Sequence, residues 1–301
     1  MEKNNFQQNL NTNMNDDLFK LSYEVYHHTK AIRTLSVNKR GILVTGSIDG
    51  TCAIFEKKEP EFHYTLLNST KLHTDGVYIV RSSIDDNFFF TGGKDAIVNM
   101  MDNQGNPLKE FIGHTKIVNS ISQAECDTFI SGSWDGTAIV WDIETSKDIL
   151  QLTGHSYAVT TLALPNKKFI TASQDKAIKF WDGGKLYKTV EAAHEDIIRC
   201  IILDEDRNSF YTCSNDTVIK QWTMDGRMIG VLENHESFLF TILKKNGILF
   251  SGGDEKIVKY WQGSKVLGEL FHPNTIWDMA CDENNDLITG NFNTLYYFLY
   301  L

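Results

Sequence analysis

Residues 131–142 read SGSWDGTAIVWD, residues 171–182 read TASQDKAIKFWD, and this pair of related stretches decides the fold. Both stretches begin with a serine or threonine, continue to an aspartate four positions on, and reach a tryptophan six positions after that. With this spacing as a ruler, seven copies are found along the 301-residue chain. They lie roughly 41 residues apart, so the sequence is built from an internal repeat.

Four columns of residues recur through the seven copies. The hydroxyl column is Thr45, Thr91, Ser131, Thr171, Thr212, Ser251 and Thr289. The turn column is Asp49, Asp95, Asp135, Asp175, Asp216, Glu255 and Asn293. The tryptophan column is Phe55, Met101, Trp141, Trp181, Trp222, Trp261 and Leu299. A histidine precedes each turn residue by 20–22 positions, and these are His28, His73, His114, His155, His194, His235 and His272.

A repeat of this length with Gly-His near its start and Trp-Asp near its end is typical of the WD40 propeller, which has four strands in each blade. Gly113-His114 with Trp141-Asp142 carries the full signature. Segments 137–141 and 176–181 are short, rich in β-forming residues, and follow tight turns. We therefore predict an all-β chain folded as a seven-bladed WD40 β-propeller.

The closure of the ring can also be predicted. The chain stops just after the third strand of the seventh blade, while residues 18–26, LFKLSYEVY, alternate as a half-buried strand does. We predict that this N-terminal strand completes the last blade. The propeller then occupies residues 18–301, and the Asn-rich tail 1–17 is expected to be disordered.

Composition excludes several classes of function. The net charge of −10 argues against nucleic acid as a partner, because phosphate binding needs a basic surface. Apolar runs are far shorter than the ~20 residues of a membrane span, and residues 1–17 lack the apolar core of a signal peptide. Five cysteines without a CxxC motif fit reduced thiols. We expect a cytoplasmic or nuclear protein that binds no membrane.

The repeated polar residues suggest a structural role. A histidine, a serine and an aspartate are the components of a nucleophilic triad, but an enzyme does not need several identical triads. In WD40 propellers, which this chain resembles, such side chains form a hydrogen-bonded tetrad from the tryptophan to the turn aspartate. Blades three to five contain all four members: His114, Ser131, Asp135, Trp141, His155, Thr171, Asp175, Trp181, His194, Thr212, Asp216 and Trp222.

We expect no enzyme, metal or cofactor. Histidines on successive blades should lie ~10 Å or more apart, too far to share a metal ion. The sequence contains neither a phosphate-binding GxxxxGK[ST] loop nor a GxSxG nucleophile elbow. Blades one, two and seven lack the tryptophan, so the ring should be loosest there.

Function is therefore expected on a surface. In such propellers the positions three and five after the histidine, and one before the turn residue, usually point to the top face. The candidate partner-binding residues there are Ile48, Tyr78, Trp134, Phe238, Phe240, Asp254, Trp277 and Phe292. Exposed aromatic clusters usually mark a protein interface. The alternative is that several of these rings fill the central channel or cover strand ends.

Several phrases give a closer resemblance. Blade seven reads HPNTIWDMACDENNDLITG at 272–290, and blade six contains Ser251-Gly-Gly-Asp-Glu255. With Gly113-His114-Thr115, these resemble the propeller of the phospholipase A2-activating protein family, the Doa/Ufd-type ubiquitin adaptors. The resemblance implies ubiquitin as the partner, bound by the aromatic top face and by acidic residues, for which we expect Asp254, Asp278 and Glu236.

The resemblance also implies a role in ubiquitin-dependent degradation. Family members carry a ubiquitin-binding domain and then a helical repeat domain after the propeller, and the helical repeat domain docks on an AAA unfoldase. Neither of these two domains fits in this chain, so an unfoldase would be reached only through C-terminal domains absent here. A general interaction scaffold with a different top-face partner is the alternative. A phosphodegron receptor would need clustered arginines, whereas Arg33, Arg199 and Lys94 lie on separated blades.

Overall fold

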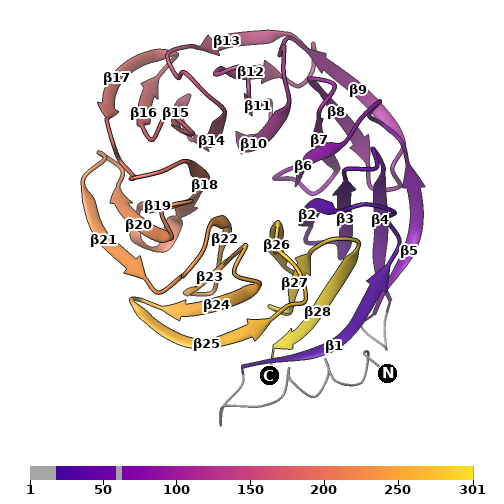
Figure 1. The fold of residues 1–301 in the computed structure, drawn as a ribbon. Helices are drawn as coiled ribbons and strands as arrows, with labels where there is room; N and C mark the ends of the chain where they lie inside the picture. Colours follow the sequence, from indigo (N-terminus) through magenta and orange to yellow (C-terminus); the bar gives the residue numbers. More distant parts are fainter. Residues whose placement is uncertain (1–17, 59–62, 301) are drawn as a thin grey trace.

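The computed structural model describes residues 18–58 and 63–300, and these form a ring of seven four-stranded antiparallel sheets. The sheets stand around a central axis like the blades of a propeller (Figure 1). The only helix among the described residues is the short 3-10 turn η1 (Glu205–Arg207). The prediction of a seven-bladed all-β propeller is confirmed.

Each blade runs from an inner strand at the channel to an outer strand at the rim. Blades one to three consist of β2 (Ile32–Val37), β3 (Ile42–Ser47), β4 (Cys52–Lys58) and β5 (His63–Thr70), then β6 (Val77–Ser82), β7 (Phe88–Gly93), β8 (Ile97–Asp102) and β9 (Pro107–Ile112), then β10 (Val118–Glu125), β11 (Thr128–Ser133), β12 (Ala138–Asp142) and β13 (Asp148–Leu152). Blades four and five consist of β14 (Val159–Leu164), β15 (Lys168–Ser173), β16 (Ile178–Asp182) and β17 (Lys185–Val190), then β18 (Ile198–Asp204), β19 (Ser209–Ser214), β20 (Val218–Thr223) and β21 (Met228–Glu233). Blades six and seven consist of β22 (Leu239–Lys245), β23 (Ile248–Gly253), β24 (Ile257–Gln262) and β25 (Lys265–Phe271), then β26 (Asp278–Cys281), β27 (Leu287–Gly290), β28 (Thr294–Tyr300) and β1 (Phe19–Tyr26).

The N-terminal strand closes the ring, as the sequence predicts. Strand β1 pairs antiparallel with β28, so one blade joins both ends of the chain (Figure 1). The alternation of LFKLSYEVY explains the pairing, because Phe19 is buried while Lys20 and Ser22 on the opposite face are exposed. The Phe19 ring packs edge-on against Phe250 of blade six at 5.5 Å. The expected disordered tail 1–17 lies outside the described residues.

The hydrophobic core lies between neighbouring blades. The second and third strands are almost wholly buried, and their side chains pack against the next blade. In the interface of blades two and three, the Trp141 ring contacts Phe111 and Phe129. Phe55 and Met101, which replace tryptophan in the first two blades, are 1% and 0% exposed, so they still fill the core position.

The turn between the second and third strands places the turn residue of each repeat. In blade three the amide of Gly136 donates to the Ser133 carbonyl, and Gly136 adopts a φ of 85°. In blade four Lys176 holds the same left-handed conformation at 71°. Asp135 lies within the turn of blade three, and its Oδ1 accepts the amide of Thr137, which fixes the carboxylate beside the strand ends. The top face carries these turns and the histidine loops.

Candidate interaction surface at the channel mouth

The tetrads of blades three to five are continuous hydrogen-bonded chains. In blade three, Trp141 Nε1 lies 2.8 Å from Ser131 Oγ, Ser131 Oγ lies 2.8 Å from His114 Nε2, and His114 Nδ1 lies 2.9 Å from Asp135 Oδ2. Because the indole can only donate and the carboxylate can only accept, the hydroxyl donates to Nε2 and Nδ1 carries a proton. The equivalent contacts in blades four and five span 2.7–2.9 Å.

These chains are structural rather than catalytic in their geometry. Ser131 is 0% exposed, so no substrate reaches its hydroxyl. Burial alone would raise the pKa of Asp135, but hydrogen bonds from His114, Thr137 and the Thr115 amide hold it below its ordinary value. The carboxylate therefore stays charged, and its hydrogen bonds join the loop that carries His114 to the turn that carries Asp135.

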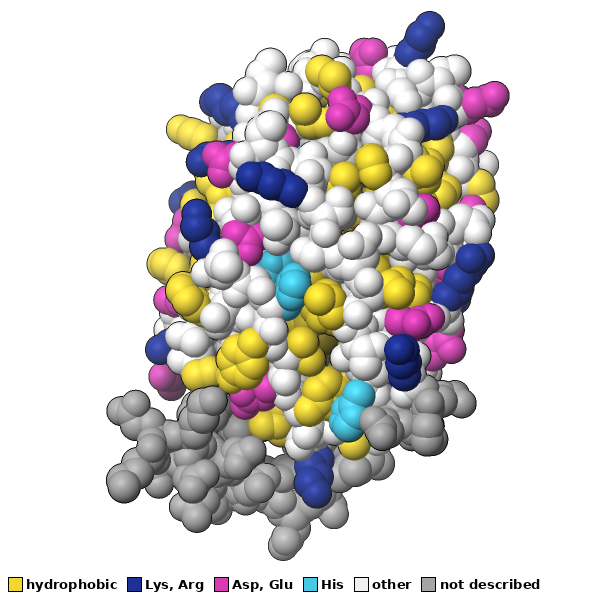
Figure 2. Space-filling view, turned by 90° about the vertical axis from the view of Figure 1, so that its right-hand side faces the viewer, with side chains coloured by type: hydrophobic (Ala, Val, Ile, Leu, Met, Phe, Trp, Pro, Cys, Tyr) yellow, Lys and Arg dark blue, Asp and Glu magenta, His cyan; other side chains and the backbone are white. Residues whose placement is uncertain are grey.

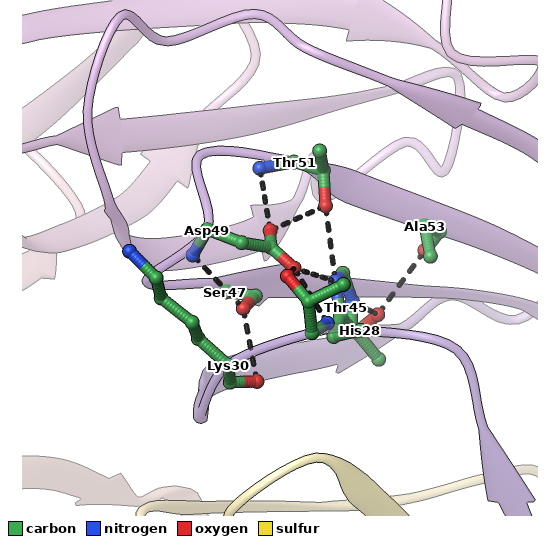
Figure 3. Close-up of polar contacts among 8 residues, drawn as sticks. His28, Lys30, Thr45, Ser47, Asp49, Thr51 and Ala53 are labelled. Atoms are coloured by element: carbon green, nitrogen blue, oxygen red, sulfur yellow. Dashed lines mark hydrogen bonds and ion pairs between the residues drawn. The ribbon is translucent and has the colours of Figure 1, made fainter.

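The network varies in the other blades. In blade six Glu255 replaces aspartate and still reaches His235 Nδ1 at 2.7 Å, so this blade also contains a complete tetrad. In blade one His28 contacts both Thr45 and Thr51, and the Asp49 carboxylate accepts hydrogen bonds from the neighbouring loop (Figure 3). Blade one thus retains the histidine, hydroxyl and acidic members of the tetrad, while Phe55 takes the place of the tryptophan.

Blade seven has no such network. His272 makes no hydrogen bond through either ring nitrogen with the part of the chain that the structure describes. Its ring instead lies between Tyr296 and Phe298, with centroids 5.3 Å from each. Burial lowers the pKa of His272 to about 3, so the ring is neutral at physiological pH.

The residues five positions after each histidine gather around the mouth of the central channel. They line one end of the central channel, a cavity of about 650 Å³ that extends to Ile84 and Leu203 at the far ends of the inner strands. The members of this ring are Arg33, Tyr78, Asn119, Thr160, Arg199, Phe240 and Trp277. Ile48 and Trp134, from the turn position, also line the cavity. Positions from all seven repeats therefore converge on one opening.

The aromatic and cationic members of this ring are stacked. Phe240 and Trp277 lie parallel with centroids 4.7 Å apart, so the neighbours expected from their equal spacing are indeed adjacent. The Arg33 guanidinium lies 3.8 Å from the Trp277 centroid and 5.4 Å from that of Tyr78. Tyr78 in turn contacts the edge of Trp134 at 6.2 Å. The stacked side chains form a rigid surface at the mouth of the channel that a partner can contact.

The structure divides the candidate aromatic residues into two groups. Trp134, Phe238 and Phe292 are 41%, 46% and 57% exposed. Ile48, Tyr78, Phe240 and Trp277 are only half-exposed and line the cavity, as the alternative interpretation anticipated. Phe238 and Asp254 are neighbours on the top face, because the Asp254 amide donates to the Phe238 carbonyl. Asp254 and Glu236 are exposed, as expected for acidic surface residues.

The expectation that Asp278 is a surface acid is wrong. It is 6% exposed and lies at the inner edge of blade seven. Its Oδ2 accepts from the Thr34 hydroxyl, the Leu35 amide and Arg81, at 3.0–3.1 Å, and its Oδ1 accepts from Thr241. These donors come from blades one, two and six. One carboxylate therefore links the four blades around the closure.

Sequence reasoning missed the convergence of the arginines. Arg33 and Arg199 come from blades one and five, yet both line the same cavity. Arg199 Nε donates to Asn215 at 2.9 Å, and its guanidinium lies 5.4 Å from the Phe240 centroid. Burial lowers the pKa of Arg33 to about 10 and also lowers the pKa of Arg199. Their equal spacing from the repeat histidines was the signal that could have placed both at the mouth.

The outer wall has a different character from the mouth. Figure 2 shows hydrophobic side chains spread between charged and polar ones on the side of blades one and two. Leu66, Leu108 and Ile112 are exposed on the outer strands there. Single exposed apolar residues are normal on a protein surface.

Residues 18–58 and 63–300 contain neither a metal centre nor a membrane-spanning helix. No group of three or more histidine, cysteine, aspartate or glutamate side chains is arranged to hold a metal ion there. No helix in these ranges has the length and apolar character needed to cross a membrane.

Known proteins resemble this chain at the level of the repeat. The WD domain, G-beta repeat family matches residues 19–56, 64–102, 105–142, 146–182 and 184–223. The ubiquitin homeostasis protein lub1 of Schizosaccharomyces pombe is 32% identical over 91% of this chain, and protein DOA1 of Saccharomyces cerevisiae is 31% identical over 74% of it. The chain spans only 38% and 31% of the lengths of these relatives.

A solved structure extends the similarity to three dimensions. The crystal structure of the WD40 β-propeller domain of Doa1 superposes with a TM-score of 0.84 at 29% identity, covering 93% of this chain and 96% of that one. Since the family match spans more than half of the sequence and the superposition spans the whole ring, this chain belongs to the WD domain, G-beta repeat family, and its fold is a WD40 propeller of the Doa/Ufd type.

Proposed function

We propose that this chain is a non-enzymatic ubiquitin-binding propeller that serves as an adaptor in ubiquitin-dependent degradation. The observation that carries the proposal is the set of exposed aromatic residues on the top face of a Doa/Ufd-type propeller, namely Trp134, Phe238 and Phe292. The relative lub1 is named as a ubiquitin homeostasis protein, and this name supports a role in the ubiquitin pathway.

The chemistry of the top face suits this partner. Ubiquitin is recognised through a small apolar patch flanked by basic residues. Phe238 offers an apolar contact, and Asp254 and Glu236 beside it offer negative charge. The stacked ring of Phe240 and Trp277 lies next to them and would hold the apolar surface in one shape.

Other parts of the proposal rest on the family alone. The resemblance to the phospholipase A2-activating protein family implies a connection to an AAA unfoldase through domains that follow the propeller. It also implies action in the cytoplasm or nucleus. We propose both for the protein of which this propeller is the ubiquitin-reading part.

Titration of ¹⁵N-labelled ubiquitin with this chain tests the proposal. Phe238→Ser should weaken binding by about 1–2 kcal/mol, as loss of an interface aromatic does, and the Trp277→Ala, Phe240→Ala double variant should weaken it further. Ile112→Ser is the matched control, because Ile112 is 71% exposed on the outer strand β9. It should bind ubiquitin like the wild type.

The alternative function is a general interaction scaffold with another top-face partner. The half-buried state of Tyr78, Phe240 and Trp277 favours it, because less apolar area is then free for ubiquitin. Unchanged ubiquitin shifts at millimolar chain concentration, or equal binding by the Phe238→Ser and Ile112→Ser variants, would replace the ubiquitin proposal with this one.

A further inference from the structure

Arg33 is a half-buried cation of the central channel. It lines the channel mouth, and its Nε is buried without a hydrogen-bond partner. Within the ranges that the structure describes, Arg33 makes no hydrogen bond and no ion pair, and its contacts are the faces of Trp277 and Tyr78. A buried guanidinium normally has an anionic partner, because desolvation of the charge is costly.

The surroundings of the mouth leave this charge unbalanced. Of the three arginines that line the cavity, only Arg81 has a carboxylate partner, and that partner is Asp278. Arg33 and Arg199 remain, and each is stacked on one side of the Phe240–Trp277 pair. The cavity therefore has three arginines and one carboxylate, Asp278, and such an excess of positive charge concentrates anions. No carboxylate of the described residues pairs with Arg33 or Arg199, so a ligand would supply the anion.

A second unpartnered group points to a peptide. Asn119 Oδ1, in blade three, is buried beside the same cavity and accepts no hydrogen bond from the described residues. A carboxylate cannot satisfy an acceptor, but a backbone N–H can. The cavity of about 650 Å³ is the central channel itself, and Asn119 lies at its mouth together with Arg33 and Arg199.

We propose that the channel mouth binds a carboxylate-bearing peptide, with its anionic group on Arg33 and Arg199 and a backbone amide on Asn119. A carboxylate fits better than a phosphate. A guanidinium pairs with either anion through two parallel hydrogen bonds, but a phosphate carries the larger negative charge. Asp278, deeper in the cavity, adds a negative charge that disfavours a dianion. This site adjoins the exposed aromatic residues proposed for ubiquitin, because Trp134 lines the same cavity, whereas Phe238 and Phe292 do not line it.

The test uses short peptides and the indole resonance of Trp277. The ¹⁵N-labelled chain is titrated with acetyl-Gly-Glu-Gly-Gly-amide, with its glutamine counterpart, and with acetyl-Gly-Gly-Gly-Gly carrying a free carboxyl terminus. The glutamate peptide and the free terminus distinguish a side-chain carboxylate from a chain end. At least one should shift the Trp277 Nε1–H resonance saturably, with an affinity that falls as salt is added, and the glutamine peptide should not.

Variants locate the site. Arg33→Gln and Arg199→Gln should each weaken binding at least tenfold, while Arg40→Gln, which alters an exposed arginine bonded to Asn87, should leave it unchanged. Far-ultraviolet circular dichroism checks folding, and Arg199→Gln keeps the test decisive if Arg33→Gln unfolds. Equal shifts from the glutamate and glutamine peptides, or wild-type affinity in a folded Arg33→Gln or Arg199→Gln chain, would overturn the proposal. Tighter binding of a phosphoserine peptide would assign the site to phosphate instead.

Discussion

The carboxylate of Asp278 should be the most sensitive single side chain in the ring closure. Substitution by alanine removes the acceptor for the Leu35 amide, the Thr241 hydroxyl and Arg81. A buried donor left without a partner costs about 1–3 kcal/mol. The Arg81 side chain is 37% exposed, so water screens its loss and it adds less than about 1 kcal/mol.

The expected total for Asp278→Ala is a loss of about 3–5 kcal/mol in the free energy of unfolding, the range for breaking a buried charged network. Asp278→Asn keeps one acceptor oxygen and should lose about 1–3 kcal/mol. Asp254→Ala is the matched control, because Asp254 is exposed in the neighbouring blade and accepts only the Thr275 hydroxyl. It should stay within about 0.5 kcal/mol of the wild type.

Urea denaturation at pH 7, followed by tryptophan fluorescence, measures these differences. The midpoint should fall for both Asp278 variants while the slope stays constant, since the surface exposed on unfolding is the same. If Asp278→Ala and Asp254→Ala have the same midpoint, the link between blades six, seven, one and two does not stabilise the ring, and the reasoning from buried hydrogen bonds is refuted.

Three further predictions concern the ends of the ring, the tetrads and blade seven. Removal of residues 1–26 should expose the edge of β28 and cause aggregation, whereas removal of 1–17 should not change the melting temperature; a monomeric 26-residue deletion of normal stability would contradict the closure. Asp175→Ala, which breaks a complete tetrad, should cost about 1–3 kcal/mol in chemical denaturation, and Asn293→Ala should cost less, because Asn293 contacts only Thr294 through its side chain. Burial lowers the pKa of His272 to about 3 in the folded chain, whereas in the unfolded chain this histidine titrates near the ordinary value of about 6.5. Below pH 6.5 the unfolded state therefore binds one more proton than the folded state. The free energy of unfolding should fall by about 1.4 kcal/mol for each pH unit below 6.5. His272→Phe should reduce that slope, and an unchanged pH profile would show that His272 is not the group responsible.

The repeat residues could be predicted because each answers a local requirement. Trp141 and Ser131 lie ten positions apart, which sets them on adjacent paired strands, and His114 follows from the same spacing in every blade. The closure by β1 was predictable for the same reason, since the alternation of Phe19 to Val25 depends only on which face is buried. A residue's place in a periodic pattern therefore indicates directly which face of its strand it lies on and which residues of the same blade lie beside it.

The contents of the channel were harder to predict, because they depend on how blades meet. Asp278 looks like a surface acid in sequence, and only the closed ring brings it to Thr34 and Arg81. Trp277 and Tyr78 have the spacing of top-face residues, but the small radius at the channel turns them toward the cavity. Lys57 illustrates the same point at the rim, where it pairs with Asp282 of the last blade. The spacing of residues along the sequence does not give the distances between side chains on different blades.

The pairing of β1 with β28 has a consequence for how the protein is made. Strand β1 receives its partner only after more than 260 further residues have been synthesised, since β28 begins at Thr294. Six blades consist of consecutive strands and can form as the chain emerges, but Phe19 and the rest of β1 must wait with an unpaired backbone. The pairing that closes the finished ring therefore leaves β1 of the nascent chain in need of protection until β28 has been synthesised.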